Sequence, residues 1–278
     1  MPIPRMILDC ANLPGVRAVP IWVCDRRFRL WKKRHPEGSF AEFYIADVER
    51  KLGKGGHHST LGSRGWATRG SSEIDWDAAS FAGRGLVNWR QIVELGLRPD
   101  MRCVDFGCGS LRLGQHAIHY LAPSNYWGVD LTDSFIDAGI RLLPPELIAS
   151  NTPRFGVIDE ALLAEIREWA PDFIFANAVL QHVPPDELIV FFRRIAAIMT
   201  PSTRAYVLFV SGSRVRRIKS VTWAYPAALL EGHARAAAPG ALVRTIGGTP
   251  DYEQITGGGR MILCIEGIGG DAGNVNRI

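Results

Sequence analysis

The amino-acid sequence predicts an α/β protein, with a mostly parallel sheet that is covered by helices on both faces. Between about residue 101 and residue 210, short apolar segments alternate five times with segments whose apolar residues recur at helical spacing. Parallel strands need crossover connections, and helices supply them, so this alternation indicates a sheet that is buried on both sides. The first apolar segment also ends in an acid and two closely spaced glycines, which indicates a sharp turn at a strand end.

The residues before this region are mixed in character. WVCDRRFRLWKKRHPEG (22–38) is basic with interleaved aromatics, and the segment that follows it has Ser39 as a helix cap and helical spacing up to Leu52. Residues 53–72 are rich in glycine, which predicts a loop, and His57 and His58 within it could close over a site. We expect residues 1–75 to form a helical and irregular cap and residues 76–278 to form the main domain.

The main domain is expected to begin with a helix at 83–97, whose buried face carries Leu86, Trp89 and Val93. Strands are then expected at 101–106, 125–130, 154–158, 171–179 and 203–210, and helices at 111–121, 132–143, 161–169 and 185–199. The remaining chain predicts a helix at 225–239 and strands at 241–247 and 259–268, which could pair antiparallel at a sheet edge.

The composition excludes several classes of protein. Hydrophobic residues make up 47% of the 278, which is enough for a sizeable core, and a formal net charge of +4 is too small to indicate a nucleic-acid partner unless it is clustered. Five scattered cysteines, without zinc spacing, predict neither a disulfide framework nor a metal site. No segment resembles a signal peptide or a membrane span, so we expect a cytoplasmic protein with no membrane partner.

The glycine turn predicts a nucleotide-like ligand, because ligands of open α/β sheets lie beyond the carboxyl ends of the strands. A dinucleotide fingerprint would need a third glycine at position 112, which is Arg112, and Asp105 would repel a pyrophosphate but suit an ammonium group. Asp130 ends the next strand, about 20 residues further on, where a carboxylate can accept both ribose hydroxyls. S-adenosylmethionine carries both an amino-acid end and a ribose, and it is the cofactor we expect.

Three segments in order, VDFGCGSLRLG (104–114), YWGVDLTDSFIDAG (126–139) and PDFIFANAVLQHV (171–183), resemble the motifs of class I S-adenosylmethionine-dependent methyltransferases of the small-molecule type. The resemblance covers residues 82–212 and implies a Rossmann-like, doubly wound sheet of seven strands with an antiparallel last strand. It implies these cofactor contacts: Asp105, Gly107 and Gly109 with the methionine part, Asp130 with the ribose, Leu131 and Asp159 with the adenine, and Asn177 near the methionine end. Ser110 or Leu111 stands where many members carry another glycine.

The methyl acceptor is less directly indicated. ANAVLQHVPP (176–185) lacks the Asn/Asp-Pro-Pro-aromatic motif of amine-methylating members and looks more like the small-molecule enzymes. His182 could act as a general base, or it could pack beside the cofactor. Arg214, Trp223 and Tyr225 follow the fifth strand and could line an acceptor pocket, although a solvated charge and two core anchors are the alternative.

We therefore predict a methyltransferase that acts on a small molecule, at the oxygen of a sugar or a secondary metabolite. The alternatives are an RNA-modifying methyltransferase, whose basic stretches would share one face, and a catalytically inert subunit that only binds the cofactor. A dinucleotide oxidoreductase is disfavoured by the missing glycine.

Overall fold

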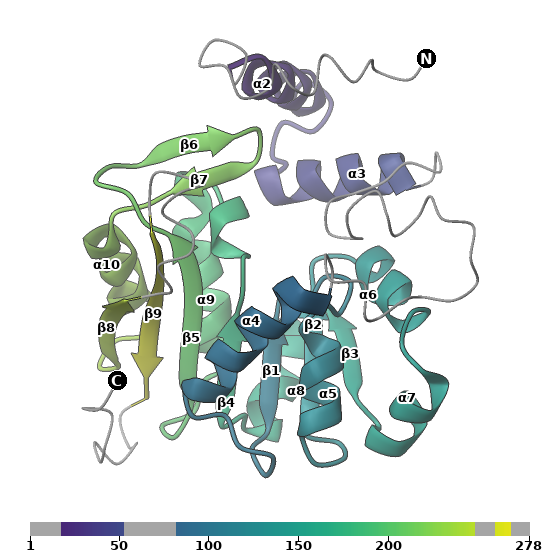
Figure 1. Ribbon diagram of the computed structural model, residues 1–278. Coiled ribbons are helices and arrows are strands. Elements are labelled where there is room, and N and C mark those ends of the chain that lie inside the picture. The colour runs from purple at the N-terminus through teal and green to yellow at the C-terminus, as the bar shows by residue number, and fades with distance from the viewer. Residues whose placement is uncertain (1–17, 53–81, 248–258, 268–278) are drawn as a thin grey trace.

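The computed structural model describes residues 18–52, 82–247 and 259–267. Seven strands form one sheet in the order β3-β2-β1-β4-β5-β9-β8 (Figure 1). The strands are β1 (Cys103–Phe106), β2 (Tyr126–Asp130), β3 (Arg154–Val157), β4 (Phe173–Ala176), β5 (Arg204–Val210), β8 (Leu242–Gly247) and β9 (Arg260–Glu266). Strands β1 to β5 are parallel, and β9 is antiparallel to both of its neighbours, β5 and β8. The predicted seven-stranded sheet with an antiparallel last strand is confirmed.

Helices cover both faces of this sheet. The helices of the main domain are α4 (Ala82–Glu94), α5 (Gly114–Tyr120), α6 (Asp133–Ile140), α7 (Pro145–Asn151), α8 (Glu160–Trp169), α9 (Leu188–Ile198) and α10 (Ala227–Ala237). Buried residues of α8, α9 and α10 form one core with one face of the sheet, and those of α4, α5 and α6 form a second core with the other face. The result is a three-layer α/β/α domain.

The strands are apolar because both of their faces are buried. Along β1, Val104 and Phe106 belong to the first core, whereas Cys103 belongs to the second. Asp105 alternates onto the same side as Cys103 and is 2% exposed. This buried acid in the middle of the sheet stands out from its neighbours, because an ionisable group is rarely buried without a purpose or a partner.

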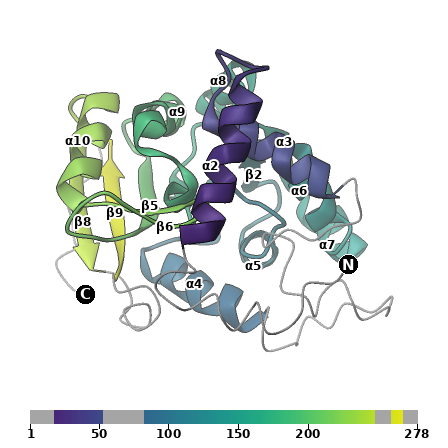
Figure 2. The same ribbon diagram turned by 90° about the horizontal axis from the view of Figure 1, so that it is seen from above.

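The cap of the molecule consists of α2 (Ala18–Lys32) and α3 (Phe40–Leu52), which lie above the carboxyl edge of the sheet (Figures 1 and 2). Ser39 begins α3 with a reciprocal pair of hydrogen bonds: its Oγ accepts from Glu42 N at 3.1 Å, and Glu42 Oε2 accepts from Ser39 N at 3.1 Å. Phe28 packs against Phe40 and Phe43, with ring centroids 5.2 Å apart in both pairs. The predicted domain boundary at residue 75 lies outside the described residues and stays a prediction.

A small hairpin follows the fifth strand. It consists of β6 (Arg216–Lys219) and β7 (Thr222–Ala224), which pair antiparallel and form a separate two-stranded sheet. Its second strand is buried and packs beneath the cap. The segment that the sequence indicated as an acceptor-pocket wall is therefore a hairpin that contacts the N-terminal helices.

Candidate functional site

The predicted cofactor residues gather at the carboxyl ends of three adjacent strands. Strand β1 lies between β2 and β4 and is parallel to both, so the loops that follow these strands meet at one edge (Figure 1). The strand order also reverses at β1, with β2 and β3 on one side and β4 and β5 on the other. Ligands of open α/β sheets bind at this kind of switch point.

The glycine turn after β1 has the backbone that its residues predict. Gly107 has φ +84° and Gly109 has φ +55°, both in the left-handed region. A Cβ on Gly107 would lie 2.3 Å from Val179 Cγ2, in the loop after β4. Leu111, one of the two residues at which a further glycine was considered, has φ +61°, a conformation that glycine adopts more easily. The turn therefore keeps the expected shape and carries strain at Leu111.

Asp130 joins the ends of β1 and β2. Its Oδ2 accepts a hydrogen bond from Gly109 N at 2.7 Å, and its Oδ1 accepts one from Leu131 N at 2.7 Å. Burial raises the pKa of Asp130 to about 6, although both N–H donors act in the opposite direction. Each carboxylate oxygen has a second acceptor position, so the group can bind a pair of hydroxyls while it keeps the turn in place.

Asp105 has a partner that the sequence did not indicate. The hydroxyl of Tyr126, on β2, donates to Asp105 Oδ2 at 3.0 Å, and both side chains are buried. A Cβ on Gly114 would lie 2.5 Å from the Tyr126 hydroxyl, so this glycine leaves room for the pair. Burial raises the pKa of Asp105 to about 8, while the hydrogen bond from Tyr126 lowers it. A cation placed beside this carboxyl group would stabilise its charged form.

Asn177 presents an unsatisfied acceptor at the end of β4. Its Oδ1 is buried and accepts no hydrogen bond from the part of the chain that the structure describes. The next residue, Ala178, has φ +61°, a second strained position at this edge. A buried acceptor without a donor costs about 1–3 kcal/mol, so Asn177 fits the ammonium or hydroxyl donors of a bound cofactor.

Asp159 has a structural role in this conformation. It ends the β3 loop and caps α8, because its Oδ1 accepts from Leu162 N at 2.7 Å. Its contact with the adenine stays a prediction, as does the packing of the half-buried Leu131 on the adenine.

His182 lies in the loop after β4 and is held in one tautomer. Its Nδ1 is 2.6 Å from the carbonyl oxygen of Val221, which can only accept, so the neutral ring carries its hydrogen on Nδ1. Its Nε2 is left with a lone pair and lies 3.2 Å from the side-chain amide nitrogen of Gln181. Burial lowers the pKa of His182, which favours the neutral ring. This is the protonation state that a general base requires.

Helix α3 spans the site from one loop to the next. The Glu187 carboxylate, just beyond the His182 loop, accepts from the backbone N–H groups of Phe40 and Ala41 at the start of α3. Further along the helix, the Tyr44 ring stacks on the His182 ring with centroids 6.3 Å apart. At 3.4 Å, Glu49 accepts from the Thr132 hydroxyl, in the loop after β2. One helix thus contacts both the predicted base and the loop after the predicted ribose acceptor.

Comparison with known proteins assigns the domain. Residues 104–205 match a family model described as "Methyltransferase domain". This segment has the sequence of a methyltransferase domain. No curated protein matches the chain. The resemblance to this family that the sequence motifs indicated is confirmed for the segment from β1 to the start of β5.

Solved structures share the fold of this methyltransferase domain at low sequence identity. The magnesium protoporphyrin IX methyltransferase ChlM from Synechocystis PCC 6803, solved with bound S-adenosylhomocysteine, is 15% identical with a TM-score of 0.54 and covers 81% of this chain and 99% of that one. The [4+2]-cyclase SpnF is also 15% identical with a TM-score of 0.54, over 70% and 85% of the two chains. At these identities the likeness shows the fold alone, and one of the two is named for a different reaction.

Two of the three predicted acceptor residues lie in the core of the methyltransferase domain. Trp223 and Tyr225 are 6% and 0% exposed, and the Tyr225 hydroxyl donates to the backbone carbonyl of Val183. Both pack in the first core, as the alternative interpretation expected, and their contact with a substrate stays a prediction. Arg214 is exposed on the loop before the hairpin, and its contact with a substrate stays a prediction.

Arg217, three residues after Arg214, binds the cap. Its guanidinium group forms an ion pair with Asp25 on α2 and lies 4.9 Å from the centroid of the Trp223 ring. It also lies 6.0 Å from the centroid of the Phe40 ring, on α3. Arginine between aromatic faces and a carboxylate is a stabilising arrangement, so the hairpin anchors both cap helices.

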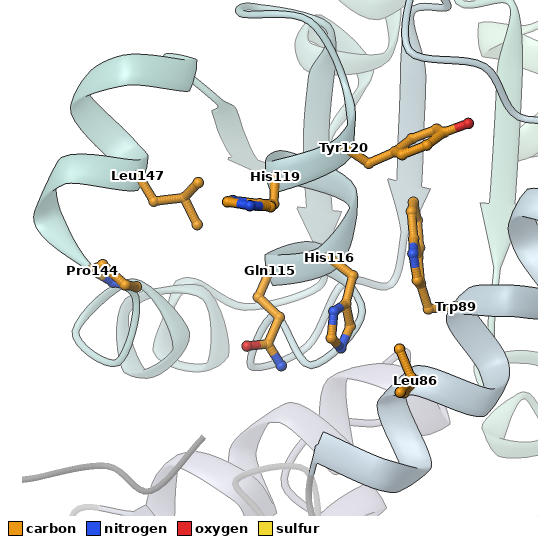
Figure 3. A pocket seen from close by; sticks show the side chains of 8 residues that line it. All are labelled: Leu86, Trp89, Gln115, His116, His119, Tyr120, Pro144 and Leu147. Carbon is orange, nitrogen blue, oxygen red and sulfur yellow. The ribbon is translucent and has the colours of Figure 1, made fainter. Parts of the chain in front are cut away.

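A separate cavity of about 500 Å³ lies between α4, α5 and α7 (Figure 3). It is lined by Leu86, Trp89, Gln115, His116, His119, Tyr120, Pro144 and Leu147. None of the predicted site residues lines it, and the rings of Trp89 and His116 stack with centroids 6.2 Å apart. His57 and His58, predicted in a closing loop, lie outside the described residues. The described residues contain no metal-binding cluster of histidine, cysteine and acidic groups and no helix that could span a membrane.

Proposed function

We propose that this protein transfers a methyl group from S-adenosylmethionine to an oxygen atom of a small molecule, a sugar or a secondary metabolite. The observation that carries the proposal is the arrangement at the carboxyl edge of β1, β2 and β4. There, the buried Asp105 and the half-buried Asp130 lie on neighbouring strands, and Asn177 has an acceptor that no donor of the described residues satisfies. The ChlM structure, whose fold this domain shares, holds S-adenosylhomocysteine, which supports the choice of cofactor.

The residues that would hold the cofactor each suit the chemistry of a different part of it. Asp130 accepts the ribose hydroxyls, and Asp105 with Asn177 accepts from the ammonium group at the methionine end. Gly107 and Gly109 allow a ligand to approach the backbone, and Leu131 and Asp159 lie towards the adenine. When bound, S-adenosylmethionine supplies the methyl group as an electrophilic sulfonium.

His182 would accept the proton of the methyl acceptor. Its Nε2 has the lone pair, and the carbonyl of Val221 stabilises the imidazolium that forms by accepting from Nδ1. The carbon–oxygen bond then forms as the carbon–sulfur bond breaks, and the products are a methyl ether and S-adenosylhomocysteine. Helix α3 excludes water from this step by covering the His182 loop.

The first experiment measures cofactor binding by calorimetry with S-adenosylmethionine and S-adenosylhomocysteine. Asp130→Ala removes the predicted ribose acceptor, and we expect affinity to fall at least about 100-fold, since two charge-assisted hydrogen bonds are lost. Asp133→Asn is the matched control, because this neighbouring acid is exposed at the start of α6. If the wild-type protein binds neither compound, the proposal is wrong.

The second experiment measures release of S-adenosylhomocysteine with panels of sugars, phenols and amines. With the true acceptor, His182→Asn should lower kcat by about 100-fold or more while cofactor affinity stays unchanged, whereas exposed His119→Asn should have no effect. Because the pKa of His182 is lowered, kcat at saturating cofactor should fall only below about pH 6.5, the ordinary value for histidine. Cofactor binding without turnover on any acceptor would favour an inert binding subunit, and full activity of His182→Asn would exclude the base.

A further inference from the structure

Helix α2 presents an unusual outward face. Six residues at helical spacing are exposed: Trp22, Val23, Arg26, Arg29, Leu30 and, directly after the helix, Lys33. Trp22, Leu30 and Val23 are 57%, 51% and 41% exposed, which is high for large apolar side chains on one short helix. Three cations alternate with them, and the Arg26 guanidinium lies 5.8 Å from the centroid of the Trp22 ring.

The opposite face of α2 accounts for the folding of the helix. Phe28 packs into the aromatic cluster of the cap, and Arg27 forms an ion pair with Asp47 on α3. Asp25, the single acid of the helix, is paired with Arg217 of the hairpin. The inward face carries the packing and the acid, whereas Trp22, Val23 and Leu30 belong to neither core of the described residues.

We propose that this outward face docks the protein onto an anionic membrane surface. A peripheral helix of this kind needs Trp and aliphatic side chains that enter the interface, with Lys and Arg that bind anionic headgroups. Both are present on one face without a carboxylate. At 15 residues the helix would lie on the surface rather than span the bilayer.

Lipid fits this face better than nucleic acid. Arg26, Arg29 and Lys33 could bind phosphates of either partner, and Trp22 could stack on a base. Val23 and Leu30 have no flat ring and no polar group, so they gain from burial in an acyl boundary but not from contact with RNA. From its sequence this basic stretch could contact RNA or an anionic membrane, but a solvated face was favoured and no membrane partner was expected; surface docking revises that expectation.

Docking through α2 would also orient the molecule. The helix lies beyond α3, above the carboxyl edge of the sheet (Figures 1 and 2). That edge holds the candidate site, so the site would face the bilayer. The docking itself does not depend on the proposed reaction, and its test does not require turnover.

The test is co-sedimentation of the full chain with vesicles. One set contains phosphatidylglycerol and phosphatidylcholine in equal parts, and the other contains phosphatidylcholine alone. We expect binding to the anionic set that weakens with salt. The double variant R26E/R29E should lower the partition coefficient by at least about 30-fold, since each cation near an anionic surface contributes about 5-fold and reversal adds repulsion. Its matched control is R90E/R193E, which changes two exposed arginines on α4 and α9 by the same charge.

Two leucine substitutions distinguish insertion of apolar side chains into the membrane from simple attraction between charges. Leu30→Ser should weaken vesicle binding several-fold, whereas Leu242→Ser, at an equally exposed leucine on β8, should not. The proposal is overturned if wild-type protein does not sediment with anionic vesicles, if R26E/R29E binds as well as its control, or if Leu30→Ser has no effect. Tighter binding to a single-stranded RNA oligonucleotide than to the anionic vesicles, at equal salt, would assign the face to nucleic acid instead.

Discussion

The buried carboxyl group of Asp105 makes the stability of the protein depend on pH. Its pKa is about 8 in the folded state because of burial, against an ordinary value near 3.9 in an unfolded chain. The folded protein therefore keeps a proton that the unfolded chain releases above about pH 4. Stability falls as pH rises from about 4 to about 8, by roughly 1.4 kcal/mol for each pH unit in that interval. Between pH 6 and pH 7.5 the loss from this one group is about 2 kcal/mol.

Asp105→Asn tests this reasoning, since asparagine keeps the shape and can still accept from the Tyr126 hydroxyl. We expect the free energy of unfolding, measured with urea at several pH values without cofactor, to fall less steeply with pH in the variant. Asp130 and Glu187 also have raised pKa values, but they contribute to both proteins, so the difference between the two curves reports Asp105. A difference that does not change between pH 6 and pH 7.5 would refute the buried-acid explanation.

Two further substitutions test how the loops and the cap are held. Glu187→Ala removes the acceptor at the start of α3, and we expect amide hydrogen exchange of α3 to rise about 5-fold or more, as for a lost cap of about 1 kcal/mol, while exchange in the central strands is unchanged. If the amide protons of α3 exchange equally slowly in both proteins, Glu187 does not hold the start of α3 in place. Gly107→Ala should destabilise the protein by about 1–3 kcal/mol in thermal or urea unfolding, because of its positive φ and its close contact with Val179. Val179→Ala should restore part of that loss, and Gly247→Ala, which has open space, should cost little.

The succession of strands along the chain and the residues at the site edge could be predicted from the sequence because they depend on local patterns. Strands that are buried on both faces are continuous apolar segments of the sequence. Asp130, Gly107 and Gly109 come at the ends of two such segments. Parallel pairing then places these strand ends together without further information. The Ser39 cap of α3 was equally local, since it needs only the acid three residues later.

Contacts between distant segments could not be predicted in this way. In the sequence, Tyr126 has the features of an ordinary strand residue. Its hydrogen bond to Asp105 depends on the pairing register of β1 and β2, which places Asp105 opposite Gly128. Trp223 and Tyr225 are the aromatics of a hairpin that the sequence pattern did not indicate. Leu86, predicted on the buried face of α4, lines the cavity and is 37% exposed, whereas Ile92 fills the core.

Two helices were also missed, for opposite reasons. Helix α7 has seven residues and buries none of them completely, so it has no periodic apolar face to detect. Helix α2 has apolar residues on both sides, and the exposed Trp22 and Leu30 obscure the stripe that packs on α3.

Strand β9 has a consequence for how the chain can be made. It occupies an interior place in the sheet, between β5 and β8, although it follows every other strand among the described residues. Until the ribosome has released residues 260–266, β5 keeps an open edge and β8 has no neighbour to pair with. The nascent polypeptide therefore cannot complete its domain before residues 260–266 have been translated, and it must keep an apolar strand edge from aggregating until then.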